Sequence, residues 1–308
     1  MDLARKTDHI LKNHSSIGFK ALKLEIWNFP LFSTLCDLDR WLHIAVKPGI
    51  EELDLQIYES RAVRITGEEL SCLLSCSVAL EKLTLKSCDE LIFLEIPSLP
   101  QRLSHLVVAH CTNLEAIKIK APNLYSFDYS GALIPLSLGD SLQNLYIDAL
   151  LGRQDVVHYP WADLLRMVPH LEDLEITSYC PVDADHVRQE SVFGESSHDL
   201  RQMPGHMHRN IKDVLSIGFC SAKSMVELTC HMLENAKSLE YLTLNTSSDH
   251  EILCSNSKNG RCQPMSKDVR MEARKALFAV ERYILGKVPS TVKLEVVKPC
   301  SRCNTLEI

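Results

Sequence analysis

The sequence predicts an α/β solenoid, in which coils stack side by side and place parallel strands on a concave face. A short apolar pattern over residues 83–91 returns over residues 106–114, a shift of 106 − 83 = 23 residues. This pattern is typical of a leucine-rich repeat, whose period is about 20–29 residues. The alternating leucines predict a strand with one buried face, which a coil can bury only against a neighbouring coil. The two copies read Leu83-x-Leu85-x-x-Cys88-x-x-Leu91 and Leu106-x-Val108-x-x-Cys111-x-x-Leu114.

Four segments join a helical pattern to a strand pattern in one shared register. Counting back from the first strand leucine of each, one apolar residue stands three positions earlier and another stands nine positions earlier. This agreement predicts a helix on the convex face followed by a parallel strand on the concave face. The three aligned sets are Leu53, Leu83, Leu174 and Leu242; Ile50, Leu80, Leu171 and Leu239; and Ile44, Leu74, Leu165 and Leu233.

The first repeat is preceded by two further elements. Residues 3–14 have helical spacing, and the apolar alternation from Phe19 to Ile26 predicts the first strand. Pro48 and Gly49 then end the helix of the first helix-to-strand segment.

The stretch from residue 90 to residue 150 predicts a different kind of coil. Helical spacing is absent there, and apolar alternation recurs about every half coil, punctuated by prolines such as Pro97 and Pro122. We therefore expect thin coils with a strand on both faces, so that the convex face carries helices in some coils and short strands in others.

Two polar stretches interrupt the C-terminal part of the chain. Residues 180–210 and residues 248–264 have few apolar residues and no period, and we expect an insertion and a loop. The strand over 211–219 lies between them, and its register is ambiguous. Three apolar residues compete for its inner face: Val214, Leu215 and Ile217.

The C-terminal end of the chain predicts a helix over residues 267–285 and a last strand. Ser266 can cap the helix, Gly286 can end it, and the strand alternates from Val292 to Val296. We expect one leucine-rich-repeat domain over residues 1–308. Its parts are regular repeats over 1–179, the polar insertion over 180–210, and C-terminal repeats over 211–308.

Composition and charge narrow the class of protein. Apolar residues make up 45% and charged residues 24%, and the net charge of −7 disfavours nucleic acid as a partner. No apolar run reaches the length that spans a membrane, and the first residues lack the apolar core of a signal peptide. We therefore expect the twelve cysteines to be free thiols in a reducing compartment, the cytoplasm or the nucleus, without membrane contact.

Three stretches of the sequence resemble one plant family. Residues 38–55 (LDRWLHIAVKPGIEELDL), residues 200–246, and the ending over residues 265–303 (MSKDVRMEARKALFAVERYILGKVPSTVKLEVVKPCSRC) carry the resemblance. They look like the leucine-rich-repeat region of plant F-box proteins of the F-box/LRR, or FBD, type. The resemblance implies the substrate-recognition part of a cullin-type ubiquitin ligase, in which the repeats bind the protein to be ubiquitinated.

The F-box helix bundle of that family docks a Skp-type adaptor, and no such bundle occurs in the 308 residues. Adaptor binding is therefore expected only if an F-box lies upstream. The alternative is an independent repeat scaffold or regulatory protein unconnected to ubiquitination.

The strand positions between the inward residues predict the binding surface, because solenoids usually bind partners on the concave face. We expect a protein segment carrying Lys or Arg to bind there, with an apolar contact at Tyr146. The alternative is a solvated sheet face without a partner. The predicted partner-binding residues are Glu25, Asp54, Lys86, Asp128, Tyr146, Asp148 and Glu175. The other solvent-facing positions are Lys23, Gln56, Thr84, Val107, Ala109, Ser130, Thr177, Thr243 and Asn245.

Two clusters are candidate sites for chemistry. Cys254, Cys262, Cys300 and Cys303 could hold zinc, but wide spacing favours free thiols. The polar insertion contains histidines and carboxylates that could bind a metal, but a solvated polar loop is the favoured interpretation. No nucleophile elbow, P-loop or dinucleotide fingerprint is present, so we expect neither enzymatic activity nor a cofactor. The insertion cluster comprises Glu195, His198, Asp199, His206 and His208.

Overall fold

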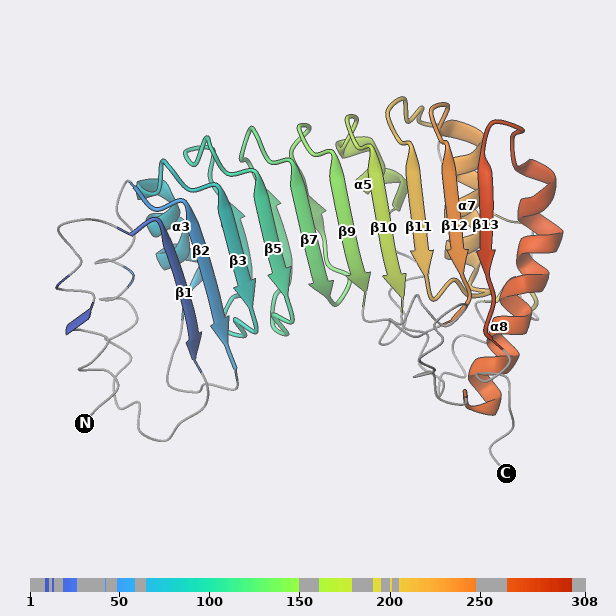
Figure 1. Cartoon of the computed structure of the whole chain (residues 1–308), viewed down its shortest axis with the longest axis horizontal. Coiled ribbons are helices and arrows are strands. Elements are labelled where there is room, and N and C mark those ends of the chain that lie inside the picture. Colours follow the sequence, from blue (N-terminus) through green and yellow to red (C-terminus); the bar gives the residue numbers. More distant parts are fainter. Residues whose placement is uncertain are drawn as a thin grey trace. The chain divides into compact units, whose positions relative to one another are not determined.

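The computed structural model divides the chain into two compact units, Met1–Leu142 (unit 1) and Gln143–Ile308 (unit 2). In each unit the strands are parallel and follow one another in chain order (Figure 1). No helix among the described residues is long and apolar enough to cross a membrane. The described residues are 9–10, 13, 19–26, 42, 49–58, 65–149, 161–178, 191–194, 200, 205–247 and 265–300.

Five parallel strands form the main sheet of unit 1, in the order β1-β2-β3-β5-β7. The register places the first inward residue of each strand in a single line, from Leu22 through Leu53, Leu83 and Leu106 to Phe127. The last four of these side chains are buried, which confirms the predicted register. The strands are β1 (Ala21–Ile26), β2 (Glu52–Ile57), β3 (Lys82–Lys86), β5 (His105–Ala109) and β7 (Ser126–Gly131).

The other side of unit 1 changes from helix to strand along the chain, as predicted for the thin coils. Helix α3 (Gly67–Cys76) begins at a capping box, in which Glu69 N–H donates to Thr66 Oγ1 and Thr66 N–H donates to the Glu69 carboxylate. A Cβ atom at Gly67 would meet the Phe93 carbonyl oxygen at 2.3 Å, so glycine lets α3 approach β4 closely. The second sheet of unit 1 contains β4 (Phe93–Ile96), β6 (Ala116–Ile119) and β8 (Leu136–Ser137).

The repeated cysteines lie at the corners that follow β3 and β5. Ser87 and His110 adopt positive φ values of 54° and 56°, and each next residue, Cys88 or Cys111, is a buried free thiol. A hydrogen bond with Cys111 and burial both raise the pKa of Cys88, so its thiol stays protonated. A small buried thiol therefore occupies each of these two tight corners.

Unit 2 contains five parallel strands in the order β9-β10-β11-β12-β13, with helices α5 and α7 on one face of the sheet (Figure 1). The Ser266 hydroxyl caps α8 by accepting from Val269 N–H at 3.3 Å, as predicted. A π-helical turn (Val280–Ile284) and a 3-10 turn (Leu285–Lys287) continue α8. The elements are β9 (Asn144–Ala149), α5 (Trp161–Met167), β10 (Asp173–Ser178), β11 (Asp213–Ile217), α7 (Lys223–Asn235), β12 (Tyr241–Asn245), α8 (Lys267–Ala279) and β13 (Lys293–Val297).

The structure resolves the ambiguous register of β11. Val214 pairs with Leu174 and Leu242 and points inward, whereas Leu215 pairs with Glu175 and Thr243 on the opposite face. At the end of the strand, Gly218 has a φ of 68°, and a Cβ atom there would meet the Ser178 carbonyl oxygen at 1.9 Å. Glycine is therefore required where β11 turns close to β10.

Several predicted segments lie wholly or mostly outside the described residues. The loop over 248–264 is outside them, as are Cys254, Cys262 and Cys303 of the possible zinc site. Of the predicted N-terminal helix, the three described residues are helical: His9, Ile10 and Asn13.

Leu106 tests the stacked core of unit 1. It is fully buried and lies in register between Leu83 and Phe127, so Leu106→Ala should remove both packing contacts. We expect this variant to lose roughly 2–5 kcal/mol of unfolding free energy in urea denaturation. Val107→Ala, one residue away on the half-exposed face, is the matched control and should lose much less. An unchanged midpoint for Leu106→Ala would contradict the core assignment.

Candidate functional site

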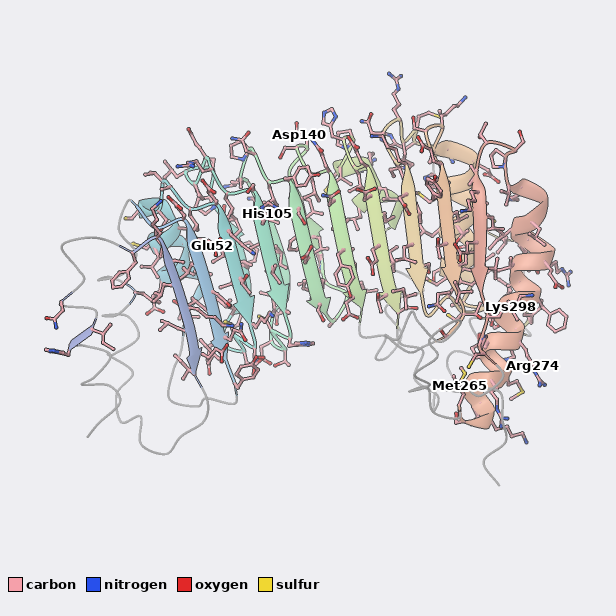
Figure 2. All side chains as sticks on the ribbon, viewed as in Figure 1. Glu52, His105, Asp140, Met265, Arg274 and Lys298 are labelled. Carbon is pink, nitrogen blue, oxygen red and sulfur yellow. The ribbon has the colours of Figure 1, made fainter. Side chains whose placement is uncertain are left out.

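The candidate site lies on the main sheet of unit 1 and on the sheet of unit 2. In each, it is the face opposite the inward leucines, and we call this face the strand face. Three rows of side chains cross it, because residues one, three and five of each strand point the same way. Glu52 and His105, labelled in Figure 2, are first-row residues of β2 and β5 in unit 1. The rows pair in register across neighbouring strands, so residues distant in sequence lie next to one another.

The strand face of unit 1 neutralises its own charges at β1 and β2. Lys23 Nζ lies 2.7 Å from Glu25 Oε1 and 3.6 Å from Asp54 Oδ2. The hydrogen bond with Glu25, together with the charges of both carboxylates, raises the pKa of Lys23. Gln56 Nε2 also donates to both oxygens of Asp54, at 3.1 and 3.0 Å. Glu25 and Asp54 therefore belong to one ion-pair network, which makes the potential of this face less negative than two free carboxylates would.

Asp128 and Lys86 complete the predicted site residues of unit 1. Asp128 is half-buried, and Ser126 Oγ donates to its Oδ1 at 3.2 Å. Burial raises the pKa of Asp128, while the hydrogen bond from Ser126 and the nearby His105 and Lys82 lower it in part. Lys86 is also half-buried, in register with Gln56. Unit 1 thus presents mixed charges rather than one sign.

The predicted site residues of unit 2 separate into exposed and buried positions. Tyr146 and Glu175 are in register in the middle row, and both are half-buried. Asp148 is only 9% exposed, and Thr177, which pairs with it in register, is 1% exposed. The prediction that these two residues face solvent is wrong. Both side chains are short, and with neighbouring strands about 4.8 Å apart each is covered by the side chains beside it in the third row.

Four other residues that were predicted to face solvent are also buried. Three of them have short side chains, and the fourth, Gln56, is hydrogen-bonded to Asp54. The buried members are Gln56, Thr84, Ala109 and Asn245.

Unit 2 gathers two carboxylates that were not predicted from the sequence, Asp173 and Asp213, beside the predicted Glu175. Asp173 and Asp213 are first-row residues in register on β10 and β11, and Glu175 follows in the middle row beside Leu215. Burial, and then the charge of Asp173, raise the pKa of Asp213. We call Asp173, Glu175 and Asp213 the acidic patch. Both newly found carboxylates stand at the first position of their strands, and the alternation that predicts the later outward positions extends to this first position as well.

Aromatic and apolar side chains adjoin the acidic patch. Tyr146 is in register with Glu175 on one side, and Leu215 is in register with it on the other. On β12, Tyr241 pairs with Asp213 and is 47% exposed. Lys293 Nζ lies 5.7 Å from the centroid of the Tyr241 ring. The acidic patch therefore adjoins two tyrosine rings and a leucine side chain.

The histidines of the predicted polar insertion have a different environment from the one expected. His208 is buried, and its Nε2 lies 3.0 Å from Nε2 of His231 on α7. His231 Nδ1 in turn lies 3.1 Å from Asn235 Nδ2, and His208 N–H donates to the Asn235 carbonyl at 3.0 Å. The prediction of a solvated loop is therefore wrong for His208, whose ring fixes residues 205–210 to α7.

The described residues contain no group of three or more His, Cys, Asp or Glu side chains that could hold a metal. His206 is half-buried with its ring centroid 5.2 Å from that of His208. Glu195, His198 and Asp199 lie outside the described residues.

The fold alone defines the class of protein. Repeated coils whose parallel strands share one register are the architecture of a leucine-rich-repeat protein. A sequence model of the At1g61320/AtMIF1 LRR domain matches residues 10–62, 58–183 and 179–301. Because these matches together cover most of the chain, it belongs to this plant leucine-rich-repeat family. No curated protein matches the chain. Membership confirms the predicted repeat fold and supports a protein-interaction module.

The buried histidines predict a loss of stability at acidic pH. Burial, followed by the charges of His231 and His206, lowers the pKa of His208 to about 4. The unfolded chain therefore binds more protons below pH 6.5, and the folded state loses stability as the pH falls. Between pH 8 and pH 4, this difference in the pKa of His208 lowers the free energy of unfolding by about 3 kcal/mol.

Urea denaturation across this pH range tests the prediction. His208→Gln should flatten the dependence of unfolding free energy on pH, whereas the exposed control His170→Gln should leave it unchanged. Equal pH dependence in wild type and His208→Gln would show that His208 does not titrate differently in the two states.

Proposed function

We propose that the chain is a protein-binding leucine-rich-repeat module without catalytic activity, and that the strand face of unit 2 is its contact surface. The favoured ligand is a partner segment carrying Lys or Arg beside an apolar side chain. One observation carries the proposal: Asp173 and Asp213 are held in register on adjacent strands next to Glu175 and Leu215. Opposite charges on the partner would relieve the repulsion between these carboxylates.

The stability cost of the acidic patch supports a binding role. A carboxylate whose pKa is raised in the fold, as for Asp213, destabilises the folded state at neutral pH. Like charges in register on neighbouring strands add to that cost. Proteins commonly retain such locally unfavourable residues where function requires them.

We further propose that the partner is a protein to be ubiquitinated, and that the chain acts as the recognition part of an F-box-type ubiquitin-ligase receptor. The resemblance of residues 38–55, 200–246 and 265–303 to F-box/LRR proteins of the FBD type supports this role. A cytoplasmic or nuclear location accords with it. The second candidate is an independent scaffold, for which the repeat fold alone is sufficient support.

The acidic patch yields a paired test. Asp173→Asn with Asp213→Asn should slow association with a partner isolated by affinity capture and mass spectrometry, and should reduce the dependence of the rate on salt. Stopped-flow measurements between about 50 mM and about 500 mM salt would resolve the effect. The double variant should also be slightly more stable than wild type, because repulsion is removed.

Glu115→Gln with Asp140→Asn is the matched control, because it removes two exposed carboxylates from unit 1. If the control and the patch variant change association equally, the patch has no special role.

Adaptor binding tests whether the repeats themselves contact the adaptor. In proteins of the resembled type the F-box docks the adaptor, so residues 1–308 alone should not retain a Skp-type adaptor at micromolar concentration. The same chain with an F-box fused upstream should retain it. Co-elution of the adaptor with residues 1–308 in size-exclusion chromatography would contradict this division of roles.

A further inference from the structure

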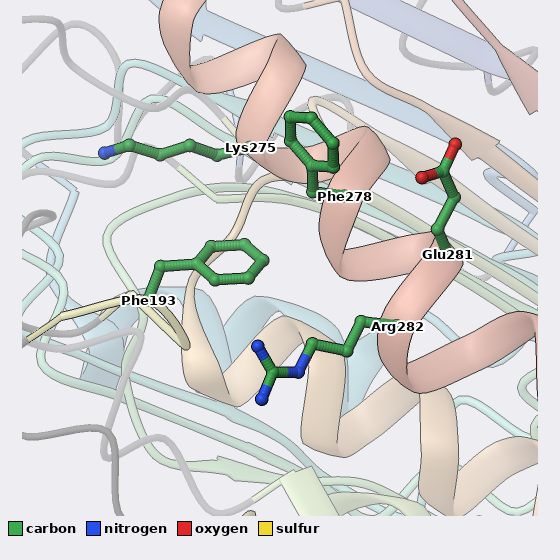
Figure 3. Close-up of a pocket in the computed structure, with 5 residues that line it drawn as sticks. All are labelled: Phe193, Lys275, Phe278, Glu281 and Arg282. Carbon is green, nitrogen blue, oxygen red and sulfur yellow. The ribbon is translucent and has the colours of Figure 1, made fainter.

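A second surface of unit 2 has the features of a binding groove and is separate from the strand face. It is an open depression of about 470 Å³ between the turn at residues 191–194 and helix α8 with its π-helical extension. Five residues line it: Phe193, Lys275, Phe278, Glu281 and Arg282 (Figure 3). The helix changes here from α to π geometry, a change often found at functional sites.

The turn that carries Phe193 is fixed in place by hydrogen bonds. Ser191 Oγ lies 2.7 Å from Ser221 Oγ, and Val192 N–H donates to the Ser221 carbonyl at 2.9 Å. Ser221 then donates to Glu272 of α8 through its N–H at 2.9 Å and its hydroxyl at 2.6 Å. The turn and the helix are thereby joined through Ser221, so the groove walls are held before any ligand arrives.

The walls of the groove are apolar and exposed. Phe278 is 62% exposed and Phe193 is 39% exposed, whereas Val192 beside it is buried. Met271, seven residues before Phe278 and so on the same side of α8, is also exposed. Exposed large apolar side chains that line one depression, as Phe193 and Phe278 do, are a feature of interaction sites.

The charges around the groove select the ligand. The Arg282 guanidinium carbon lies 5.4 Å from the centroid of the Tyr283 ring, which in turn lies 6.3 Å from that of Phe193. Within the described part of the chain, Arg282 forms no ion pair with a carboxylate. In Figure 3 the guanidinium points towards the Phe193 side, whereas the Glu281 carboxylate points away from it.

The helix also differs in charge from the chain as a whole. Residues 267–287 carry six Lys or Arg and three Asp or Glu, a net charge of 6 − 3 = +3 in a chain of net charge −7. This helical segment thus attracts acidic partners, in contrast to the acidic patch.

We propose that this groove binds an acidic segment of a partner protein, with an aromatic or leucine side chain inserted between Phe193 and Phe278 and a neighbouring carboxylate paired with Arg282. Planar guanidinium groups bind carboxylates through two parallel hydrogen bonds, and burial of one large apolar side chain supplies the remaining affinity. The groove would let the module hold a second partner while the strand face is occupied.

Fluorescence anisotropy with the full chain tests the proposal. The probe is a fluorescein-labelled peptide of sequence Asp-Glu-Phe-Leu-Glu-Asp, and we expect it to bind saturably. Phe278→Ser and Arg282→Glu should each weaken this binding about tenfold. Arg282→Lys should keep part of the affinity, since it retains the charge without the planar fork.

The matched controls are Phe93→Ser, which removes an exposed phenylalanine from unit 1, and Lys237→Glu, which makes the same change in charge as Arg282→Glu at an exposed site. Both should bind the peptide as wild type does, and circular dichroism checks the fold of each variant. The proposal is overturned if the peptide fails to saturate, if Lys-Arg-Phe-Leu-Lys-Arg binds equally well, or if folded Phe278→Ser binds as wild type does.

Discussion

The stacking of inward side chains from one coil on those of the next is the constraint on which the rest of the structure depends. No coil can bury its own strand leucines, so Leu83 requires Leu53 and Leu106 as neighbours in register. The same constraint acts where one coil carries a helix and the next carries a short strand in its place. The element on the other side of the coil is a helix at α3 and a short strand at β4, yet the inward positions stay aligned. Even Ser216, a polar residue, occupies an inward position of β11 because the register of its neighbours leaves no other.

Because the core determines the inward positions, the outward positions are free to serve binding, and the two units use them differently. Unit 1 pairs Glu25 and Asp54 with Lys23 within the face. Unit 2 instead aligns Asp173 with Asp213, at a cost in stability that the raised pKa of Asp213 reflects. This alignment of two like charges in register, rather than the number of carboxylates, favours unit 2 as the contact surface.

The fold could be predicted from the sequence because its signals are periodic and local. The register of Leu53, Leu83 and Leu174 and the strand that replaces a helix at β4 both followed from spacing alone. The site was predicted less well, because burial and pairing depend on neighbours from other coils. Asp148 alternates as an outward residue but is buried beside Thr177, and His208 lies in a polar stretch but packs on His231, 23 residues away. Spacing carries no information about such contacts.

Hydrogen–deuterium exchange of the chain with and without a captured basic partner is the most direct test of the central claim, that unit 2 binds through its strand face. The account predicts that the partner slows amide exchange in β10 and β11, around Glu175 and Leu215, and leaves exchange in β4 and β6 of unit 1 unchanged. Protection confined to β4 and β6, or to the unit 1 strands β1 and β2, would contradict the account.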